Sequence, residues 1–163
     1  MSNFDDAFDE VIGLEGGYVN DVDDTGGETN WGIAKKWHPD VDIKNLTKED
    51  AKNIYWNEYW NPFQLSRLYS VLVATEIFEQ AINMGKRQAT LHTQQSLKLL
   101  GRIISVDGFF GEQTIGNINR LHGGLREAAL IKCLNGFQFM RYLEIVSNNP
   151  SQKKFFVGWL RRI

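Results

Sequence analysis

The sequence is poor in cysteine and proline and has no long apolar run. Its single cysteine, Cys133, rules out an internal disulfide and a zinc site built from several cysteines. The apolar stretch around Cys133 predicts a buried, unreactive thiol. No segment approaches the roughly 20 apolar residues of a membrane-spanning helix, so we expect no stable membrane association. No repeat or Pro-rich linker divides the chain.

Basic residues are not in excess either. The formal charge is −2 and the isoelectric point is near 5.9. Nucleic acid is therefore not the expected partner, because binding to phosphates needs clustered Lys and Arg. The first residues are acidic and lack the basic and apolar regions of a signal peptide, so we expect synthesis in the bacterial cytoplasm without such a signal.

Apolar periodicity predicts a mostly α-helical fold. Phe4, Phe8, Val11 and Ile12 recur at the spacing of one helical face. Thr47 followed by Asp50 is typical of a capped helix start. Residues 18–33 are rich in Asn, Asp, Thr and Gly, which predicts a small β-hairpin or an ordered loop after the first helix. Further helices are expected at residues 68–84, 86–100, from 112, 124–147 and 151–162.

Glu15 stands out at the end of the first helix. It continues the apolar stripe by one step, which would direct its carboxyl toward the core. Burial and the negative end of the helix dipole both favour the protonated acid, the state that a general acid needs. Spacing alone also fits a helix-end Glu that turns outward to water, and slightly favours it.

The segment after Glu15 is rich in acids, including Asp21, Asp23 and Asp24, with Thr29 close behind. Glycoside hydrolysis commonly pairs a protonated acid with a second, ionised carboxylate. Turn propensity alone and a calcium loop are the alternatives, although the alternating pattern of a calcium loop is absent. The three histidines (His38, His92 and His122) show no metal-ligand spacing and are expected to be ordinary surface or capping residues. We expect neither a metal nor another cofactor.

Two runs carry a family resemblance: Leu14–Asp21, with the sequence LEGGYVND, and Asp24–Ile33, with the sequence DTGGETNWGI. Together they resemble the signature of glycoside hydrolase family 108, lysozyme-like muramidases found as phage endolysins and bacterial secretion activators. Ile77–Gly85 is also similar to the family, although Glu79 stands where an Asp is more usual. The resemblance implies a lysozyme-like helical fold.

The resemblance also implies roles for particular residues. The Glu of the Glu-Gly-Gly-Tyr motif falls on Glu15 as the catalytic acid. The spacing of Glu15, Asp24 and Thr29 is similar to the catalytic Glu–Asp–Thr set of T-even phage lysozymes, though one residue shorter between Asp and Thr; Asp23 would restore that gap. The motifs further imply substrate contacts, which we assign to Tyr18, Asn20, Asp21, Trp31 and Asn83.

The C-terminal third resembles the family's companion module, a predicted peptidoglycan-binding domain. The similar residues include Val106-Asp107-Gly108, Arg141-Tyr142 and Gly158–Arg162. We therefore expect a lysozyme-like catalytic part at residues 1–101 and a helical part at 102–163, packed as one body. The aromatic residues of the second part are expected to complete the core: Phe137, Phe139, Phe155, Phe156 and Trp159.

The resulting hypothesis is a monomeric muramidase that cleaves peptidoglycan between N-acetylmuramic acid and N-acetylglucosamine. A phage endolysin would reach the periplasmic wall through a holin-like route or by dedicated secretion. A lytic transglycosylase is the enzymatic alternative. A non-catalytic wall-binding or secretion-accessory protein is the other alternative, although such a protein has no need of a buried acid.

Overall fold

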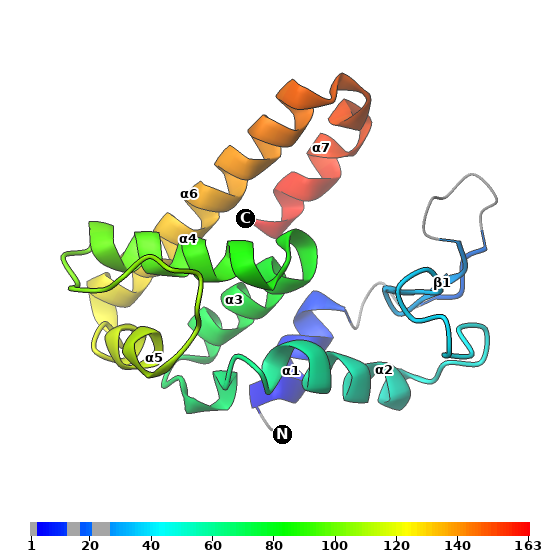
Figure 1. The fold of residues 1–163 in the computed structure, drawn as a ribbon, viewed down its shortest axis with the longest axis horizontal. Coiled ribbons are helices and arrows are strands. Elements are labelled where there is room, and N and C mark those ends of the chain that lie inside the picture. The colour runs from blue at the N-terminus through cyan, green and yellow to red at the C-terminus, as the bar shows by residue number, and fades with distance from the viewer. Residues whose placement is uncertain (1–2, 13–16, 21–26) are drawn as a thin grey trace. The chain divides into compact units, whose positions relative to one another are not determined.

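A computed structural model describes residues 3–12, 17–20 and 27–163, which divide into two compact units, Met1–Ser66 and Arg67–Ile163. The described residues form seven α-helices and one two-stranded antiparallel sheet (Figure 1). The expectation of a mostly α, lysozyme-like fold with a small hairpin after the first helix is confirmed. Among these residues no helix is both long and apolar enough to span a membrane.

In the first unit, helix α1 (Asn3–Val11) packs its aromatic face on helix α2 (Lys48–Tyr55) and the π-helical turn that continues it (Trp56–Trp60). The Phe4 ring lies 5.1 Å from Trp56, and the Phe8 ring lies 5.8 Å from Tyr55, both edge-on. The expected capping box is present, because Thr47 accepts from the Asp50 backbone and Asp50 accepts from the Thr47 backbone. The helix that starts at this cap does not stay regular, because its last turn widens to the π form.

The sheet of the first unit is a two-residue hairpin. Strands β1 (Thr29–Asn30) and β2 (Ile33–Ala34) pair with Thr29 opposite Ala34 and Asn30 opposite Ile33. Val19 adds a bridge on the other side of Thr29. The buried Asn30 amide donates to the carbonyls of Ile43 and Leu46, so the hairpin is fixed to the chain that leads into α2.

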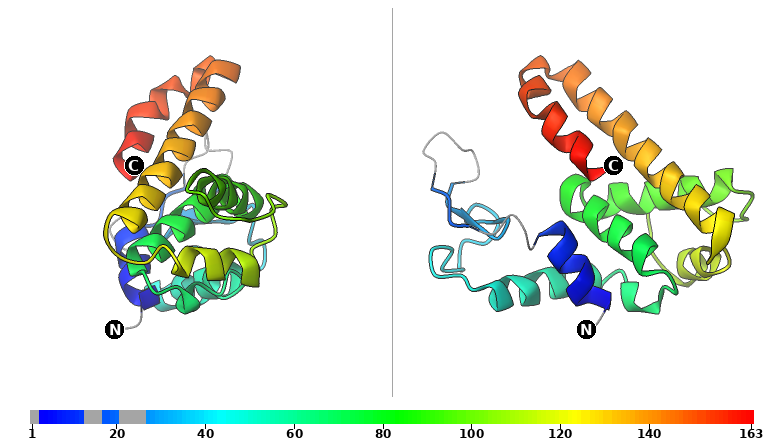
Figure 2. Two further views of the ribbon diagram at one scale, coloured as in Figure 1. Left: turned by 90° about the vertical axis from the view of Figure 1, so that its left-hand side faces the viewer. Right: turned by 180° about the vertical axis from the view of Figure 1, so that it is seen from behind.

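The second unit is helical throughout. It contains α3 (Val71–Met84), α4 (Lys86–Leu99), α5 (Glu112–Asn119), α6 (Gly124–Asn148) and α7 (Lys153–Trp159), with 3-10 turns on both sides of α7. Helix α3 is buried on nearly all sides, which suits its high apolar content. Helices α6 and α7 lie side by side and antiparallel (Figure 2). The core contains Ile77, Phe78, Leu97, Leu130 and Leu134.

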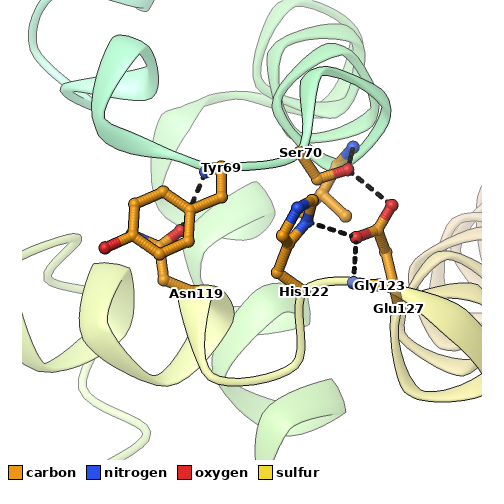
Figure 3. Close-up of polar contacts among 7 residues, drawn as sticks. Tyr69, Ser70, Asn119, His122, Gly123 and Glu127 are labelled. Atoms are coloured by element: carbon orange, nitrogen blue, oxygen red, sulfur yellow. Dashed lines mark hydrogen bonds and ion pairs between the residues drawn. The ribbon is translucent and has the colours of Figure 1, made fainter.

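Polar side chains fix the ends of these helices. Glu127 accepts from the Gly123 backbone and from His122, at 2.7 Å each, and from Ser70 at 2.8 Å (Figure 3). Since Ser70 is also the N-cap of α3, one carboxylate joins the starts of α3 and α6. Gln94 on α4 plays a similar part for the predicted turn at residues 106–111, through hydrogen bonds with Asp107, Gly108 and Phe109.

The aromatic residues of the C-terminal part do not complete the core, and that expectation is wrong. None of the five is buried, and Phe155 remains 47% exposed. The reason is visible in the burial of α6, where only Leu130, Leu134, Gln138 and Tyr142 are buried along 25 residues. Its last turns contact α7 on one side and solvent on the others. Cys133 is half-buried rather than buried.

Candidate active site

The proposed acids Glu15, Asp21 and Asp24 lie outside the described residues, as does Asp23. The residues on either side of them are described. The Val19 and Thr29 backbones exchange two hydrogen bonds of 2.8 Å. The chain segment that carries Asp21, Asp23 and Asp24 therefore begins and ends at one place, with Thr29 at its base.

Two of the predicted substrate-contact residues lie together beside this bridge. The Tyr18 hydroxyl donates to Glu28 Oε1 at 3.0 Å and also has a side-chain hydrogen bond with Asn20. Both residues are exposed, so a ligand could reach them. The Thr29 hydroxyl is half-buried and donates to the Gly27 carbonyl at 3.3 Å. Tyr18, Asn20 and Thr29 thus share one edge of the hairpin.

Trp31 occupies the turn of the hairpin with an uncommon backbone conformation. Its φ is 51°, and that of Gly32 is 75°, so both central residues of the turn are left-handed, as in a type I′ turn. A non-glycine residue adopts this conformation at a cost, and such strain is concentrated at functional positions. The Tyr55 hydroxyl supports the turn by donating to the Trp31 carbonyl at 3.2 Å.

Gly32 is required by its surroundings as well as by its φ. A Cβ at this position would lie 2.6 Å from the Tyr55 hydroxyl. The hairpin turn and the last turn of α2 are therefore in close contact. Sequence reasoning assigned Trp31 to the substrate but missed Tyr55, whose position in an apolar helical stripe gave no sign of this hydroxyl contact.

Asn83, the remaining predicted contact residue, belongs to the second unit, at the end of α3. Its side-chain amide donates to the Glu79 carbonyl and to Glu79 Oε1, at 2.9 Å each, and its oxygen accepts from Arg162. Asn83 itself is exposed, but its amide nitrogen is committed to Glu79. Its position beside Arg162 could not be read from the motif in which it occurs.

Sequence reasoning missed Glu79 as a perturbed acid. It is 8% exposed, and burial raises its pKa from 4.5 to about 7, which Glu76 assists and the hydrogen bond from Gln138 and the charge of Arg162 oppose. Gln138 donates to Glu79 Oε2 at 2.8 Å and contacts the Tyr142 hydroxyl at 2.7 Å. The apolar composition of α3 could have indicated this burial, because a helix with so few polar residues is expected to be buried on all sides, Glu79 included.

His92 is a further correction. It is 4% exposed, so it is neither a surface nor a capping residue. Its two ring nitrogens pair with Gln80 and Gln88, and its ring stacks on Phe137 at 5.4 Å. Burial, with a smaller effect of Arg141, lowers its pKa to about 4. The neutral ring is therefore part of the packing between α3, α4 and α6.

Comparison with known proteins adds to this geometry. Residues 8–85 match the family model described as glycosyl hydrolase 108, and residues 88–163 match the model described as a predicted peptidoglycan domain. Among solved structures, the chain is similar to SagA of Brucella abortus, with 26% identity and a TM-score of 0.75 over 98% of this chain and 88% of that chain. A search of curated proteins finds no match.

The helices and the small hairpin define a lysozyme-like helical fold. The two matches together span nearly the whole chain, and the chain belongs to the glycosyl hydrolase 108 family. It is accordingly a glycoside hydrolase of peptidoglycan, with peptidoglycan as its partner. The family matches meet between residues 85 and 88, whereas the compact units meet at residue 66. The division expected after residue 101 stays a prediction.

Proposed function

We propose that the protein is an N-acetylmuramidase, which hydrolyses the bond from N-acetylmuramic acid to N-acetylglucosamine. Glu15 protonates the leaving glycosidic oxygen. Asp24 stays ionised and, with Thr29, aligns the attacking water or stabilises the developing positive charge. The observation that carries this proposal is the pairing of Val19 with Thr29. It holds the base of the acidic segment against the stretch that follows directly on Glu15.

The substrate contacts follow from the same edge of the hairpin. Tyr18 and Asn20 are exposed beside the bridge and can hydrogen-bond to sugar hydroxyl and acetamido groups. Trp31 offers a flat ring on a fixed turn, which suits stacking on a sugar. Asp21 and Asn83 are assigned by their motifs alone. The contacts of Asn83 with Glu79 and Arg162 indicate that it also has a structural role.

The products of digestion test this proposal. Purified peptidoglycan is digested, reduced with borohydride and analysed by mass spectrometry. A muramidase leaves reducible muramic acid at every new end. A glucosaminidase leaves reducible glucosamine, and a lytic transglycosylase leaves an anhydro product one water lighter that resists reduction. Either of these products overturns the bond assignment, and no product at all indicates a binding protein.

We further propose that the protein acts as an endolysin and is a monomer. It is made in the cytoplasm and reaches the periplasmic wall through a holin-like pore or by dedicated secretion. Expression in Gram-negative cells should then leave the culture turbid until chloroform or a holin permeabilises the inner membrane. Lysis without either treatment would contradict the holin-like route and would indicate secretion of the protein. Light scattering of the purified protein tests the monomer.

A further inference from the structure

A small pocket in the second unit is not used by the proposed catalytic step. It has a volume of about 210 Å³ and lies between the end of α3, the later turns of α6, and the C-terminal segment. This volume is below the range of roughly 300–1,000 Å³ that is typical of sites for whole drug-sized ligands. The pocket therefore suits a terminal group. Its walls include Asn83, Arg141, Tyr142, Ile145, Trp159 and Arg162.

The walls combine two guanidinium groups with aromatic and aliphatic surface. The Tyr142 and Trp159 rings lie 5.2 Å apart at 33°, which gives one side of the pocket a flat apolar face. Arg141 and Arg162 contribute forked N–H donors that match the two oxygens of a carboxylate. A site of this kind favours a carboxylate that is attached to a small aliphatic group.

Two arginines, Arg141 and Arg162, line this pocket, and acidic side chains lie near them. Glu76 and Glu79 both act electrostatically on Tyr142 in the pocket wall. Arg141 pairs with Glu144 at 2.6 Å, but both side chains are at least 40% exposed, so this pair is weak and exchangeable. Glu79, behind Asn83, is buried and hydrogen-bonded, and its raised pKa keeps it partly neutral at pH 7. Residues 150–163 contain four basic residues and no acidic one, in a chain whose net charge is −2.

Two of the runs that carry the C-terminal resemblance meet at this pocket. Arg141 and Tyr142 form one of the similar runs, and Trp159 and Arg162 belong to another. All four line the pocket, although 15 residues lie between the two runs in sequence. Tyr142 is held in place by Gln138, and Arg162 by Asn83, so the pocket walls are oriented by neighbouring side chains.

We propose that this pocket binds the terminal carboxylate of a peptidoglycan stem peptide. Arg141 and Arg162 pair with the carboxylate, and the Tyr142–Trp159 face contacts the aliphatic side chain beside it. The sugar chain is neutral apart from its substituents and does not call for two arginines. This proposal rests on the proposed function in that it takes peptidoglycan as the substrate, and it assigns to the second unit the recognition of the peptide rather than of the glycan.

The test uses the full-length protein and diacetyl-Lys-D-Ala-D-Ala, a stem-peptide mimic with a single carboxylate, in calorimetric titrations. The C-terminal amide of the same peptide is the matched ligand. We expect the acid to bind about tenfold or more tightly than the amide, since a charge-assisted bidentate pair is lost in the amide. Equal binding of the two, or binding of neither, overturns the proposal. Tighter binding of inorganic phosphate would also overturn it in favour of a phosphate-bearing wall polymer.

Variants locate the binding. Arg141→Gln and Arg162→Gln should each weaken binding of the acid by about tenfold. Arg161→Gln removes the same charge from the neighbouring position, outside the pocket walls, and should change binding less than about twofold. Equal losses in all three variants would show general charge attraction and overturn the proposal. Circular dichroism checks folding, and the comparison of acid with amide needs no variant.

A separate assay distinguishes failure of this proposal from failure of the proposed function. Glycan strands freed of peptides by an amidase contain the scissile bond but no stem peptide. If the unaltered protein cleaves these strands but does not bind the peptide acid, only the pocket assignment is wrong. If it binds the peptide acid but yields no muramic-acid ends from any substrate, the pocket assignment holds and the muramidase assignment is wrong.

Discussion

The two compact units hold their polar residues in different ways. In Met1–Ser66 the candidate residues Tyr18, Thr29 and Trp31 are positioned by backbone pairing and by a tight turn, and their side chains stay exposed or half-buried. In Arg67–Ile163 the polar residues are buried between helices and bind one another, as Glu79 and Gln138 do. The first arrangement leaves side chains accessible to a substrate. The second fixes the helices to one another through side chains that a substrate cannot reach.

The largest expected effect comes from cutting the chain inside the second unit. A chain truncated after Gly101 loses α5 and α6, against which α3 and α4 pack. Leu130 and Leu134 are fully buried on α6, and their loss exposes the apolar faces of both helices. We expect no cooperative thermal transition and no lysis of chloroform-treated cells, measured by circular dichroism and turbidity.

A chain truncated after Asn149 is the control for this truncation. It keeps α6 and removes α7 with the 3-10 turns on either side of it, and none of the removed residues is buried. We expect it to fold, with lower stability. A folded, lytic chain ending at Gly101 that merely attaches less well to peptidoglycan would instead support two separable modules.

The next largest effect is expected at the acid that precedes the hairpin. Glu15→Gln keeps the side-chain size but cannot donate an acidic proton to the glycosidic oxygen. General acid catalysis contributes about a hundred- to ten-thousand-fold, and we expect a loss of that order in the rate of peptidoglycan hydrolysis with unchanged thermal stability. Near-native lysis by a folded Glu15→Gln protein would contradict the assignment of the acid.

Asn variants of the neighbouring acids are compared with Glu15→Gln to identify the second carboxylate. Asp24→Asn should be severe, whereas Asp21→Asn and Asp23→Asn should be milder, because only the second carboxylate needs its negative charge for the reaction. If Asp23→Asn is the inactive variant, the longer spacing to Thr29 is the correct one. Parallel rates on the same peptidoglycan preparation decide between them.

The buried polar residues of the second unit predict opposing effects of pH on stability. The raised pKa of Glu79, about 7, means that its contribution is full below its ordinary value of 4.5 and is lost as pH rises through 7. The lowered pKa of His92, about 4, means that its contribution is full above 6.5 and is lost as pH falls toward 4. Between about pH 4.5 and 6.5 the stability lost through Glu79 as pH rises is offset by the stability gained through His92.

Single variants should separate the two slopes. Urea unfolding of Glu79→Gln should show stability that increases from pH 4.5 to 6.5 relative to the unaltered protein, and His92→Gln should show the reverse. Each full change is on the order of 3 kcal/mol, because one unit of pKa corresponds to about 1.4 kcal/mol. Difference curves remove the titrations that all three proteins share. Flat difference curves for both variants would contradict these pKa shifts.

The hairpin of the first unit should be sensitive to a single methyl group. Gly32→Ala combines a left-handed φ of 75° with a Cβ placed 2.6 Å from the Tyr55 hydroxyl. We expect a loss of about 2–3 kcal/mol in the free energy of unfolding, from backbone strain and from displacement of Tyr55. Urea denaturation measures this loss, and the hydrolysis rate should fall with it.

Two comparisons divide that loss into its parts. Gly27→Ala has a similar φ of 70° with nothing within 4 Å of the added Cβ, so it should cost only the strain, about 1 kcal/mol. In a Tyr55→Phe background, which lacks the close oxygen, the added cost of Gly32→Ala should fall toward that of Gly27→Ala; the Tyr55→Phe single variant measures the loss of the hydrogen bond to the Trp31 carbonyl. No difference between Gly32→Ala and Gly27→Ala would show that Tyr55 moves away without loss.

The helices were largely predictable because their signals are local. The Thr47 capping box and the apolar spacing of α1 lie within a few residues of each other. Ser70 shows the limit of such signals, since it accepts from Val73 and starts α3 three residues later than expected. The burial of His92 was not predictable, because its partner Gln80 is on another helix. The exposure of the C-terminal aromatic residues was not predictable either, because it depends on how far α6 extends beyond the helices that pack against it.

The candidate site was predictable in its residues but not in its geometry. The Gly- and Asp-rich composition indicated a hairpin, and the motif indicated Trp31. The left-handed φ of Trp31 has no sequence signal, because this turn type usually contains Asn or Gly at that position. The turn is supported by Tyr55, which lies 24 residues later in the chain and donates a hydrogen bond to the Trp31 carbonyl.

The smallest expected effect distinguishes the ring of Trp31 from its backbone. Trp31→Asn removes the ring but supplies a residue that tolerates a left-handed φ and favours a type I′ turn before Gly32. Stability should therefore stay equal or rise by a few tenths of a kcal/mol, while the KM for peptidoglycan should rise about three- to tenfold, as expected for loss of one stacking contact. Trp37→Asn is the control, since Trp37 is 72% exposed and outside the motif, and it should leave KM unchanged. If Trp31→Asn loses stability and keeps its KM, the ring supports the fold, and the accessible side chains of the first unit do not include Trp31.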